Sequence, residues 1–137
     1  MKSTLSVLFF IAVTTLFARA EDALKPNDAY KSIRTADTFA IGPTGGAGVI
    51  SDTEVAFRVL LKQPDGVDLF KRLLPSATPA GQLYALLGLQ SLDQKAFGSV
   101  APKFLRSPKE VDVIRGCIVW RLSTAEVVSD IQAGKLK

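Results

Sequence analysis

The stretch TPAGQLYALLGLQ, residues 78–90, decides the fold. Thr78 followed by Pro79 is a strong helix start, because the threonine hydroxyl can accept from a free backbone N–H group and proline fits the first helical position. The rest of the stretch contains no charged residue. A helix that is apolar on every side is normally enclosed by its neighbours. We therefore expect residues 78–90 to form the central helix of a compact, mainly α domain with four or five helices.

Two glycines lie on nearly one face of this helix. Gly81 and Gly88 are seven residues apart, which is close to two helical turns. Each costs about 1 kcal/mol of helix propensity relative to alanine. Because glycine has no side chain, we expect another element to approach the helix closely at this face.

A second well-marked helix precedes the central one. Ser51 and Glu54 have the spacing of a capping box, which predicts a helix start at Ser51, and Pro64 ends the helix. Glu54, Arg58 and Lys62 follow one another at intervals of four residues and are expected on its solvent-exposed side.

Two more helices flank the central one. A helix from about Asp65 to Pro75 is expected to form an antiparallel pair with the preceding helix, because only a short link joins them. Asp93 should cap a helix that follows residues 78–90. Pro102 is expected to kink or split that helix.

Residues 21–137 also have helix signals near their start and near their end. Asn27 or Asp28 can cap a short helix. Near the C-terminus, Ser123 and Glu126 form a second capping box, and Gly134 is the expected end of the last helix.

The periodicity changes from helical to alternating after residue 107. Residues 111–113 and 118–120 are rich in β-branched side chains and predict two short strands, with Arg115-Gly116 as the hairpin turn between them. The alternative is a short helical turn, because the ends of residues 107–110 also have capping-box spacing. Residues 39–41 predict one further extended segment.

Residues 78–105 combine a Thr78-Pro79 helix start, the run YALLGL at residues 84–89 and an acidic turn residue, Asp93, before a second amphipathic helix. In these features they resemble a single HEAT-like helical repeat of the short bacterial kind. The helix pair at about residues 51–74 is interpreted as a degenerate copy. The resemblance implies HEAT-like helix pairs and a scaffold or protein-binding role. The strand-like C-terminal segment departs from this pattern.

Composition excludes several classes of function. The chain has no histidine, which removes Ser-His-Asp and Cys-His nucleophile systems and the commonest metal ligand. Cys117 is the single cysteine, so no intramolecular disulfide can form. Lysine and arginine residues are scattered among acidic ones, which argues against nucleic-acid binding. We expect no cofactor and no metal.

Residues 1–20 have the pattern of a secretory signal peptide. Lys2 provides the positive start, residues 5–17 form the apolar region, and Ala18-Arg19-Ala20 is a small-x-small cleavage motif. The apolar run is too short for a membrane span, which needs about 20 residues. We therefore expect a periplasmic or secreted protein with no membrane anchor after cleavage, in which residues 21–137 form a single globular domain.

Candidate functional positions lie in the C-terminal segment and in one loop. Cys117 is expected to be a small buried hydrophobe, and the alternative is an exposed, reactive thiol. Trp120 beside Arg121 has the composition of a binding hot spot. Core packing of Trp120 on the face shared with Ile118 is the commoner use of such a residue and is favoured. Segment 42–48 is glycine-rich but lacks the lysine of a phosphate-binding loop, so a turn-rich connection is expected.

These observations favour an exported, non-catalytic protein whose partner is another protein, either as a binding module or as an envelope scaffold. No catalytic residue is assigned. The alternative is a small extracytoplasmic enzyme or ligand-binding protein with a pocket near segment 42–48 and Cys117.

Export predicts a specific mature N-terminus. We expect signal peptidase to cleave after Ala20, so that the secreted protein begins at Glu21. Intact-mass analysis of the exported protein measures this directly. A mass that still includes residues 1–20 would contradict the prediction.

Overall fold

The computed structural model describes residues 23–136. The predicted signal peptide, residues 1–20, lies outside them. The described part contains six helices and a three-stranded sheet, which confirms a mainly α fold with small C-terminal strands but has more helices than expected. The elements are α2 Pro26–Arg34, β1 Thr38–Thr44, α3 Asp52–Leu61, α4 Gly66–Ser76, α5 Pro79–Leu92, α6 Gln94–Phe104, β2 Glu110–Gly116, β3 Ile118–Ser123 and α7 Thr124–Gln132.

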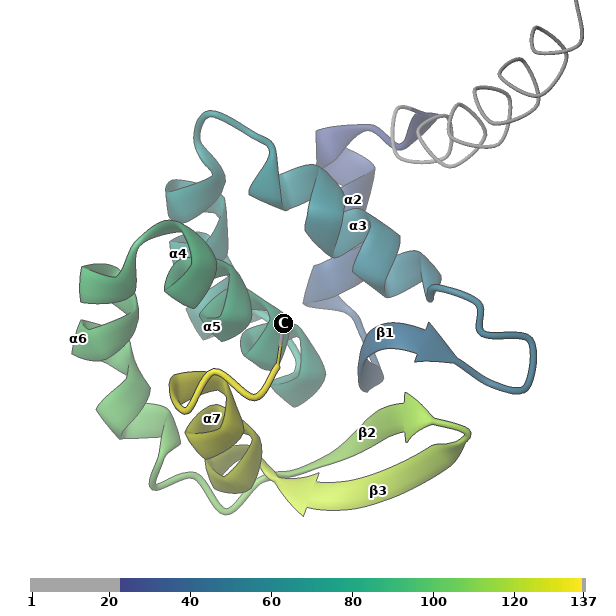
Figure 1. Ribbon diagram of the computed structural model, residues 1–137. Helices are drawn as coiled ribbons and strands as arrows, with labels where there is room; N and C mark the ends of the chain where they lie inside the picture. The colour runs from purple at the N-terminus through teal and green to yellow at the C-terminus, as the bar shows by residue number, and fades with distance from the viewer. Residues whose placement is uncertain (1–22, 137) are drawn as a thin grey trace, which may run out of the picture.

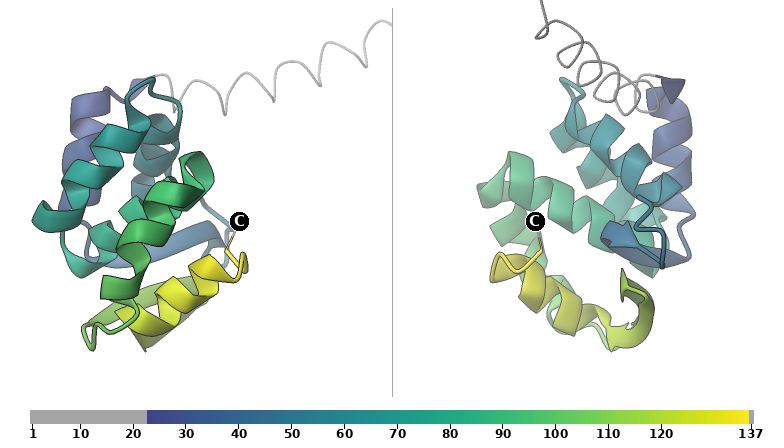
Figure 2. Two further views of the ribbon diagram at one scale, coloured as in Figure 1. Left: turned by 90° about the vertical axis from the view of Figure 1, so that its left-hand side faces the viewer. Right: turned by 45° about the vertical axis from the view of Figure 1, so that its right-hand side comes forward.

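Helix α5 is the centre of the fold, as its uncharged sequence predicts. Every residue from Leu83 to Leu89 is buried. Helices α2, α4, α6 and α7 and strands β1 and β2 all contact α5. The remaining helices and the sheet surround it in Figures 1 and 2. At its N-terminus the hydroxyl of Thr78 accepts from the Gly81 N–H at 3.2 Å, which confirms the predicted cap.

The two glycines of α5 permit close packing, as expected. A Cβ atom at Gly81 would overlap the carbonyl oxygen of Ile33 in α2, and a Cβ atom at Gly88 would overlap the ring of Phe70 in α4. Both positions are buried. Because glycine has no Cβ atom, α2 and α4 can lie directly against the central helix, and this packing offsets the lower helix propensity of the two glycines.

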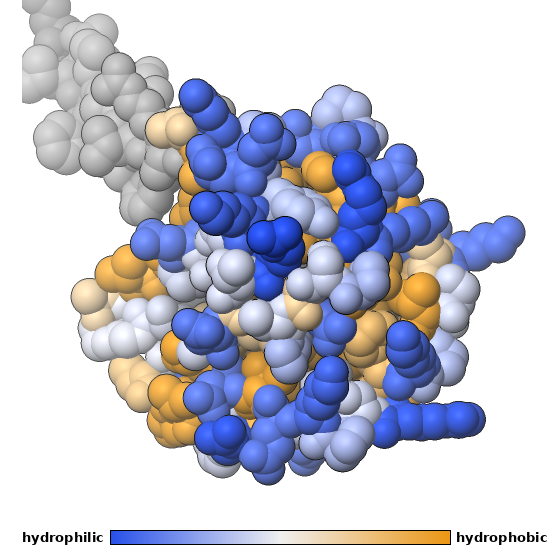
Figure 3. Space-filling view, turned by 180° about the vertical axis from the view of Figure 1, so that it is seen from behind, coloured by the Kyte–Doolittle hydropathy of each residue, from blue (hydrophilic) through white to orange (hydrophobic). Residues whose placement is uncertain are grey.

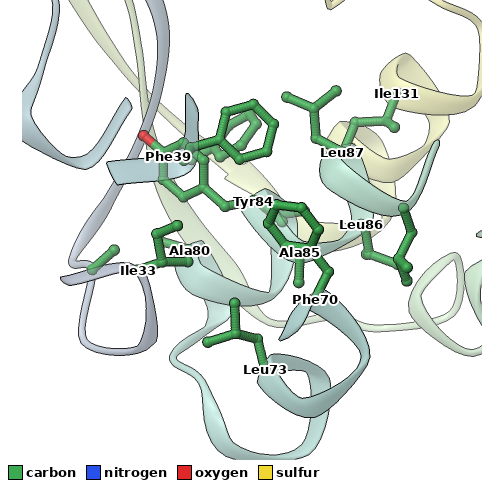
Figure 4. Close-up of a cluster of buried hydrophobic side chains, with 14 of the residues drawn as sticks. Ile33, Phe39, Phe70, Leu73, Ala80, Tyr84, Ala85, Leu86, Leu87 and Ile131 are labelled. Carbon is green, nitrogen blue, oxygen red and sulfur yellow. The ribbon is translucent and has the colours of Figure 1, made fainter. Parts of the chain in front are cut away.

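Aromatic rings join the helices to the sheet. The ring centroids of Phe39 and Tyr84 are 4.8 Å apart, and Phe57 lies 5.7 Å from both Tyr84 and Phe70. Tilted pairs at these separations are favourable beyond the area that they bury. Figure 4 shows the Tyr84 ring beside Phe39, with its hydroxyl directed at the neighbouring backbone.

The sheet combines one distant segment with one local hairpin. Strand β1 pairs with β2 in parallel, with Phe39 opposite Val113, and β2 pairs with β3 antiparallel, with Val113 opposite Trp120. The predicted hairpin is confirmed, and its turn lies one residue later than expected, because Arg115 already pairs with Ile118. Gly116 has a φ of +60°, which suits this tight turn. The pairing of residues 39–41 with this hairpin was not predicted.

Glu54 is the main exception to the expected helix faces. We expected it on the exposed side of α3, but it is 3% exposed. Its carboxylate accepts from the N–H of Gly42 at 2.8 Å and from the guanidinium of Arg58 at 2.7 Å. The charge is tolerated inside because these donors replace water. The Ser51 hydroxyl accepts from the N–H of Glu54, which confirms the predicted helix start, but the Glu54 side chain bonds Gly42 and Arg58 and so does not complete the capping box.

Two further expectations about the helices were wrong. Helix α3 packs chiefly against α2, and α4 packs chiefly against α5, so α3 and α4 do not form the expected close pair. Pro102 does not split α6, which runs on to Phe104, whereas α4 ends at Ser76, one residue after the expected end at Pro75. Each proline lies within the last turn of its helix, so the missing N–H removes a hydrogen bond only near the helix end.

Replacing Gly88 or Gly98 by alanine should change the free energy of unfolding in opposite directions, because only Gly88 is in close contact with another side chain. We expect Gly88→Ala to destabilise the protein by about 1–3 kcal/mol, because the added methyl group overpacks the core against Phe70. Gly98 in α6 is exposed, and a Cβ there would meet nothing within 4 Å. Gly98→Ala should therefore stabilise the protein by about 0.5–1 kcal/mol through helix propensity. Urea unfolding of both variants checks the pair, and equal effects would contradict the packing argument.

Candidate interaction surface

Strand β3 ends the sheet and is paired on one side only. We call residues Ile118–Arg121, with their outward-facing backbone and side chains, the β3 edge. An unpaired strand edge presents backbone donors and acceptors that another strand can use. The β3 edge is therefore the first place to look for an interaction with another polypeptide.

The pairing pattern identifies which backbone groups of the β3 edge point outward. The N–H of Thr124 donates to the carbonyl oxygen of Lys109 at 2.7 Å, so these two residues mark a hydrogen-bonded position in the register of the hairpin. Hydrogen-bonded pairs alternate along an antiparallel ladder. Trp120 and Ile118 therefore bond to β2, and the backbone groups of Val119 and Arg121 face away from it. Residues 23–136 supply no partner for these outward groups.

Three of the four side chains of the β3 edge are apolar, and all of these are exposed. Ile118 is 55% exposed, Val119 is 61% exposed and Trp120 is 49% exposed. In Figure 3, hydrophobic side chains gather at the lower left, on the side of the molecule where the β2–β3 hairpin ends. The expectation that Trp120 packs in the core is wrong. Trp120 does share a face with Ile118 and lies opposite buried Val113, but Trp120 stands on the outermost strand and Val113 on the middle one.

Cys117 is also exposed, so the favoured interpretation of it as a buried hydrophobe is wrong. It follows Gly116 in the hairpin turn, where no helix covers it. The carbonyl oxygen of Gly116 accepts from the N–H of Gly45 at 2.9 Å. The structure thus brings the turn beside the glycine-rich segment 42–48. The expectation of a turn holds for residues 45–48 only, because residues 42–44 belong to β1. Gly42, Gly45 and Gly48 have positive φ.

The charge of Arg121 is balanced within its own hairpin. Its guanidinium lies 2.8 Å from the carboxylate of Glu110 and 3.9 Å from that of Asp112, both on β2. All three side chains are exposed, so each ion pair contributes little to stability. Their effect on the surface is to leave the β3 edge without a net positive charge.

The opposite edge of the sheet is closed by side chains. The hydroxyl of Tyr84 accepts from the N–H of Ala40 at 3.0 Å and donates to the carbonyl oxygen of Ala40 at 2.8 Å. Glu54 occupies the N–H of Gly42 two residues further along β1. These bonds use the β1 groups that an added strand would need. Sequence reasoning missed both caps, although a tyrosine in an uncharged helix does signal a hydroxyl that needs a partner.

A shallow hollow lies beside β3, on the face that carries Leu122. Its volume is about 590 Å³. Arg115 crosses one wall and lies 2.8 Å from Asp130 of α7, and this hydrogen bond holds the pKa of Asp130 below its ordinary value. The lining residues are Leu105, Arg115, Leu122, Ala125, Glu126, Ser129 and Asp130.

A smaller hollow of about 210 Å³ opens near the start of β2, and three carboxylates line it, those of Asp37, Glu110 and Asp112. Arg121 also lines it and pairs with two of these acids. Among residues 23–136, no three histidine, cysteine or acidic side chains are grouped so that they could hold a metal ion. Neither hollow is lined by segment 42–48 or by Cys117.

Comparison with known protein families, with curated proteins and with solved structures found no match to this chain. Within the part that the structure describes, no helix has the length and apolar character needed to cross a membrane.

The closed β1 edge predicts a stability change that depends on pH. Burial raises the pKa of Tyr84, because the charged phenolate would be poorly solvated. The folded state thus favours the protonated hydroxyl, and this contribution to stability is fully present below the ordinary pKa of 10.0. It is lost as the pH rises through the higher folded-state value.

We expect Tyr84→Phe to lower the free energy of unfolding by about 1–3 kcal/mol at neutral pH, because two buried backbone groups of Ala40 lose their partner. The difference from the unmodified protein should shrink as the pH rises above 10.0. Denaturant titrations at several pH values measure this. Tyr30→Phe is the matched control and should change stability little, and a Tyr84→Phe effect no larger than the control would contradict the assignment.

Proposed function

We propose that this chain is an exported, non-catalytic protein-binding module that acts through the β3 edge. The observation that carries the proposal is the contrast between the two edges of one sheet. Tyr84 and Glu54 close the β1 edge, whereas β3 leaves the outward backbone of Val119 and Arg121 open beside exposed apolar side chains. Strand addition uses such backbone groups for affinity and the neighbouring side chains for specificity.

The helical part supports a scaffold role in this proposal. We retain the likeness of residues 78–105 to a HEAT-like unit, with α5 and α6 as its helix pair. These two helices contact each other and are joined at Asp93, which caps α6 by accepting from the N–H of Ala96 at 3.0 Å. In this proposal the helices hold the hairpin in place and leave the β3 edge to bind.

The rival proposal is a small extracytoplasmic enzyme or ligand-binding protein near segment 42–48 and Cys117. It is favoured by one observation, the hydrogen bond that places the Cys117 turn beside that segment. A nucleophilic cysteine needs a lowered pKa or a base, and the chain has no histidine to act as that base. The protein-binding proposal therefore ranks first.

Capture experiments with two matched variants test the proposed function. Val119→Pro removes an outward N–H that does not bond to β2, so we expect the hairpin to remain folded while strand addition is blocked. Val119→Thr keeps the N–H and the side-chain shape. Tagged mature proteins should recover the same partner polypeptide with the unmodified and threonine forms, and at least tenfold less of it with the proline form.

Quantitative mass spectrometry of envelope and medium fractions provides the measurement, and circular dichroism checks that the variants fold. Recovery of the partner by all three forms would remove the β3 edge from the proposal. Recovery of no polypeptide, together with inactivation of a detectable activity by Cys117→Ser, would favour the rival.

A further inference from the structure

We propose that the strand received by the β3 edge is the β3 strand of a second copy of this chain, paired antiparallel about a twofold axis at Trp120. This inference rests on the proposed protein-binding function and names the partner. It follows from the backbone register, the order of side chains along β3, the local charge balance and the closed edge of β1.

The backbone of β3 is complementary to itself in this register. Val119 of one copy lies opposite Arg121 of the other, and the reverse pair lies on the far side of the axis. Both residues have outward N–H and C=O groups, because their neighbours in sequence bond to β2. Each pair exchanges two hydrogen bonds, so four new bonds use all of these outward groups. The next outward N–H along the strand, that of Ser123, already donates to Glu126 at 2.8 Å.

The side chains also match in this register. The two Trp120 rings face each other across the axis, and Ile118 of one copy lies opposite Leu122 of the other. Leu122 lines the hollow beside α7, so Ile118 of the second copy lies at the mouth of that hollow. Aromatic and β-branched cross-strand pairs of this kind stabilise a sheet. Side chains that are about half exposed in one copy are thereby covered by the other.

Charge disfavours a register shifted toward Arg121. An axis at Arg121 would place two guanidinium groups directly opposite, which is destabilising. With the axis at Trp120, each Arg121 lies opposite a valine and keeps its own partners, Glu110 and Asp112. The positive charge of Arg121 is therefore neutralised within its own hairpin, although the chain as a whole is basic.

The closed β1 edge limits the assembly to two copies. Once two β3 strands pair, the outer edges of the joined sheet are both β1 edges. Tyr84 and Glu54 already occupy the outward groups of Ala40 and Gly42 there. A contact that uses the same surface on both partners closes as a dimer. We expect weak association, because one short strand from each copy forms an interface smaller than that of stable dimers.

Sedimentation of the mature protein over a range of concentrations is the first test. We expect a reversible monomer–dimer equilibrium for the unmodified protein and for Val119→Thr. Val119→Pro should remain monomeric at every concentration, with an unchanged circular dichroism spectrum. Sedimentation as a monomer up to millimolar concentration would overturn the second-copy proposal. Dimerisation of Val119→Pro equal to that of the unmodified protein would also overturn it.

Cysteine cross-linking tests the register. In a Cys117→Ser background, Val119→Cys and Arg121→Cys proteins are oxidised separately and then as a mixture. Directly opposite residues have Cβ atoms about 4.5–5.5 Å apart, whereas diagonal neighbours are about 7–8 Å apart. We expect the mixture to form the cross-linked dimer at least fivefold faster than either protein alone. Faster cross-linking of Val119→Cys with itself would overturn the axis at Trp120.

The outcomes separate this inference from the proposed function. A monomeric protein whose capture of another polypeptide is abolished by Val119→Pro overturns the second-copy partner and leaves the proposed function standing. A dimer that forms through β3 while no other polypeptide is captured supports the inference and makes self-association the binding activity. A monomer that captures nothing overturns both.

Discussion

The sheet is attached to the helices through the buried hydroxyl of Tyr84. This group both accepts from and donates to the backbone of Ala40, so one side chain of α5 takes the place of a neighbouring strand. The ring beneath it packs against Phe39 and Phe57, which fixes β1 over the central helix. The position of β1 then determines that of β2, its parallel neighbour, and β2 carries the hairpin. An unpaired polar group at this depth would be costly, so the attachment is specific in direction as well as favourable in energy.

This attachment also makes the two edges of the sheet unequal. The β1 edge lies against α5 and α3, where Tyr84 and Glu54 meet its outward backbone groups. The β3 edge lies farthest from those helices, and no residue from 23 to 136 pairs with the outward groups of Val119. Natural sheets commonly protect an edge with charges, prolines or covering elements. Here one edge has that protection and the other carries exposed Ile118, Val119 and Trp120.

Local signals in the sequence predicted most of the helix starts, but not that of α2, which begins at Pro26 after Lys25 and has no cap from Asn27 or Asp28. The caps at Ser51, Thr78, Asp93 and Ser123 all form as expected, because each depends only on residues within one turn. The hairpin was also predicted, from its alternating pattern and its glycine turn. These elements could be found because their hydrogen bonds and φ angles are determined by near neighbours in the chain.

Features that depend on distant residues were not predicted. The burial of Glu54 requires the N–H of Gly42, which a loop brings back across the start of α3. Cys117 is exposed in the hairpin turn and Trp120 on the outer strand of the sheet, and an apolar sequence alone does not indicate which strand is outermost. The sequence therefore identified Cys117 and Trp120 as candidates, but it did not predict that both are exposed.

The parallel pairing of β1 with β2 has a consequence for the order of folding. Thr38 pairs with Asp112, so most of the described chain lies between the two strands in sequence. Contacts between such distant residues form slowly, since a long loop must close first. By this argument the contacts among α2 to α5, which are closer in sequence, form before β1 meets β2. The two hydrogen bonds between Tyr84 and Ala40 lie on the side of β1 away from β2, so they can hold the first strand against α5 and leave its other side open for β2.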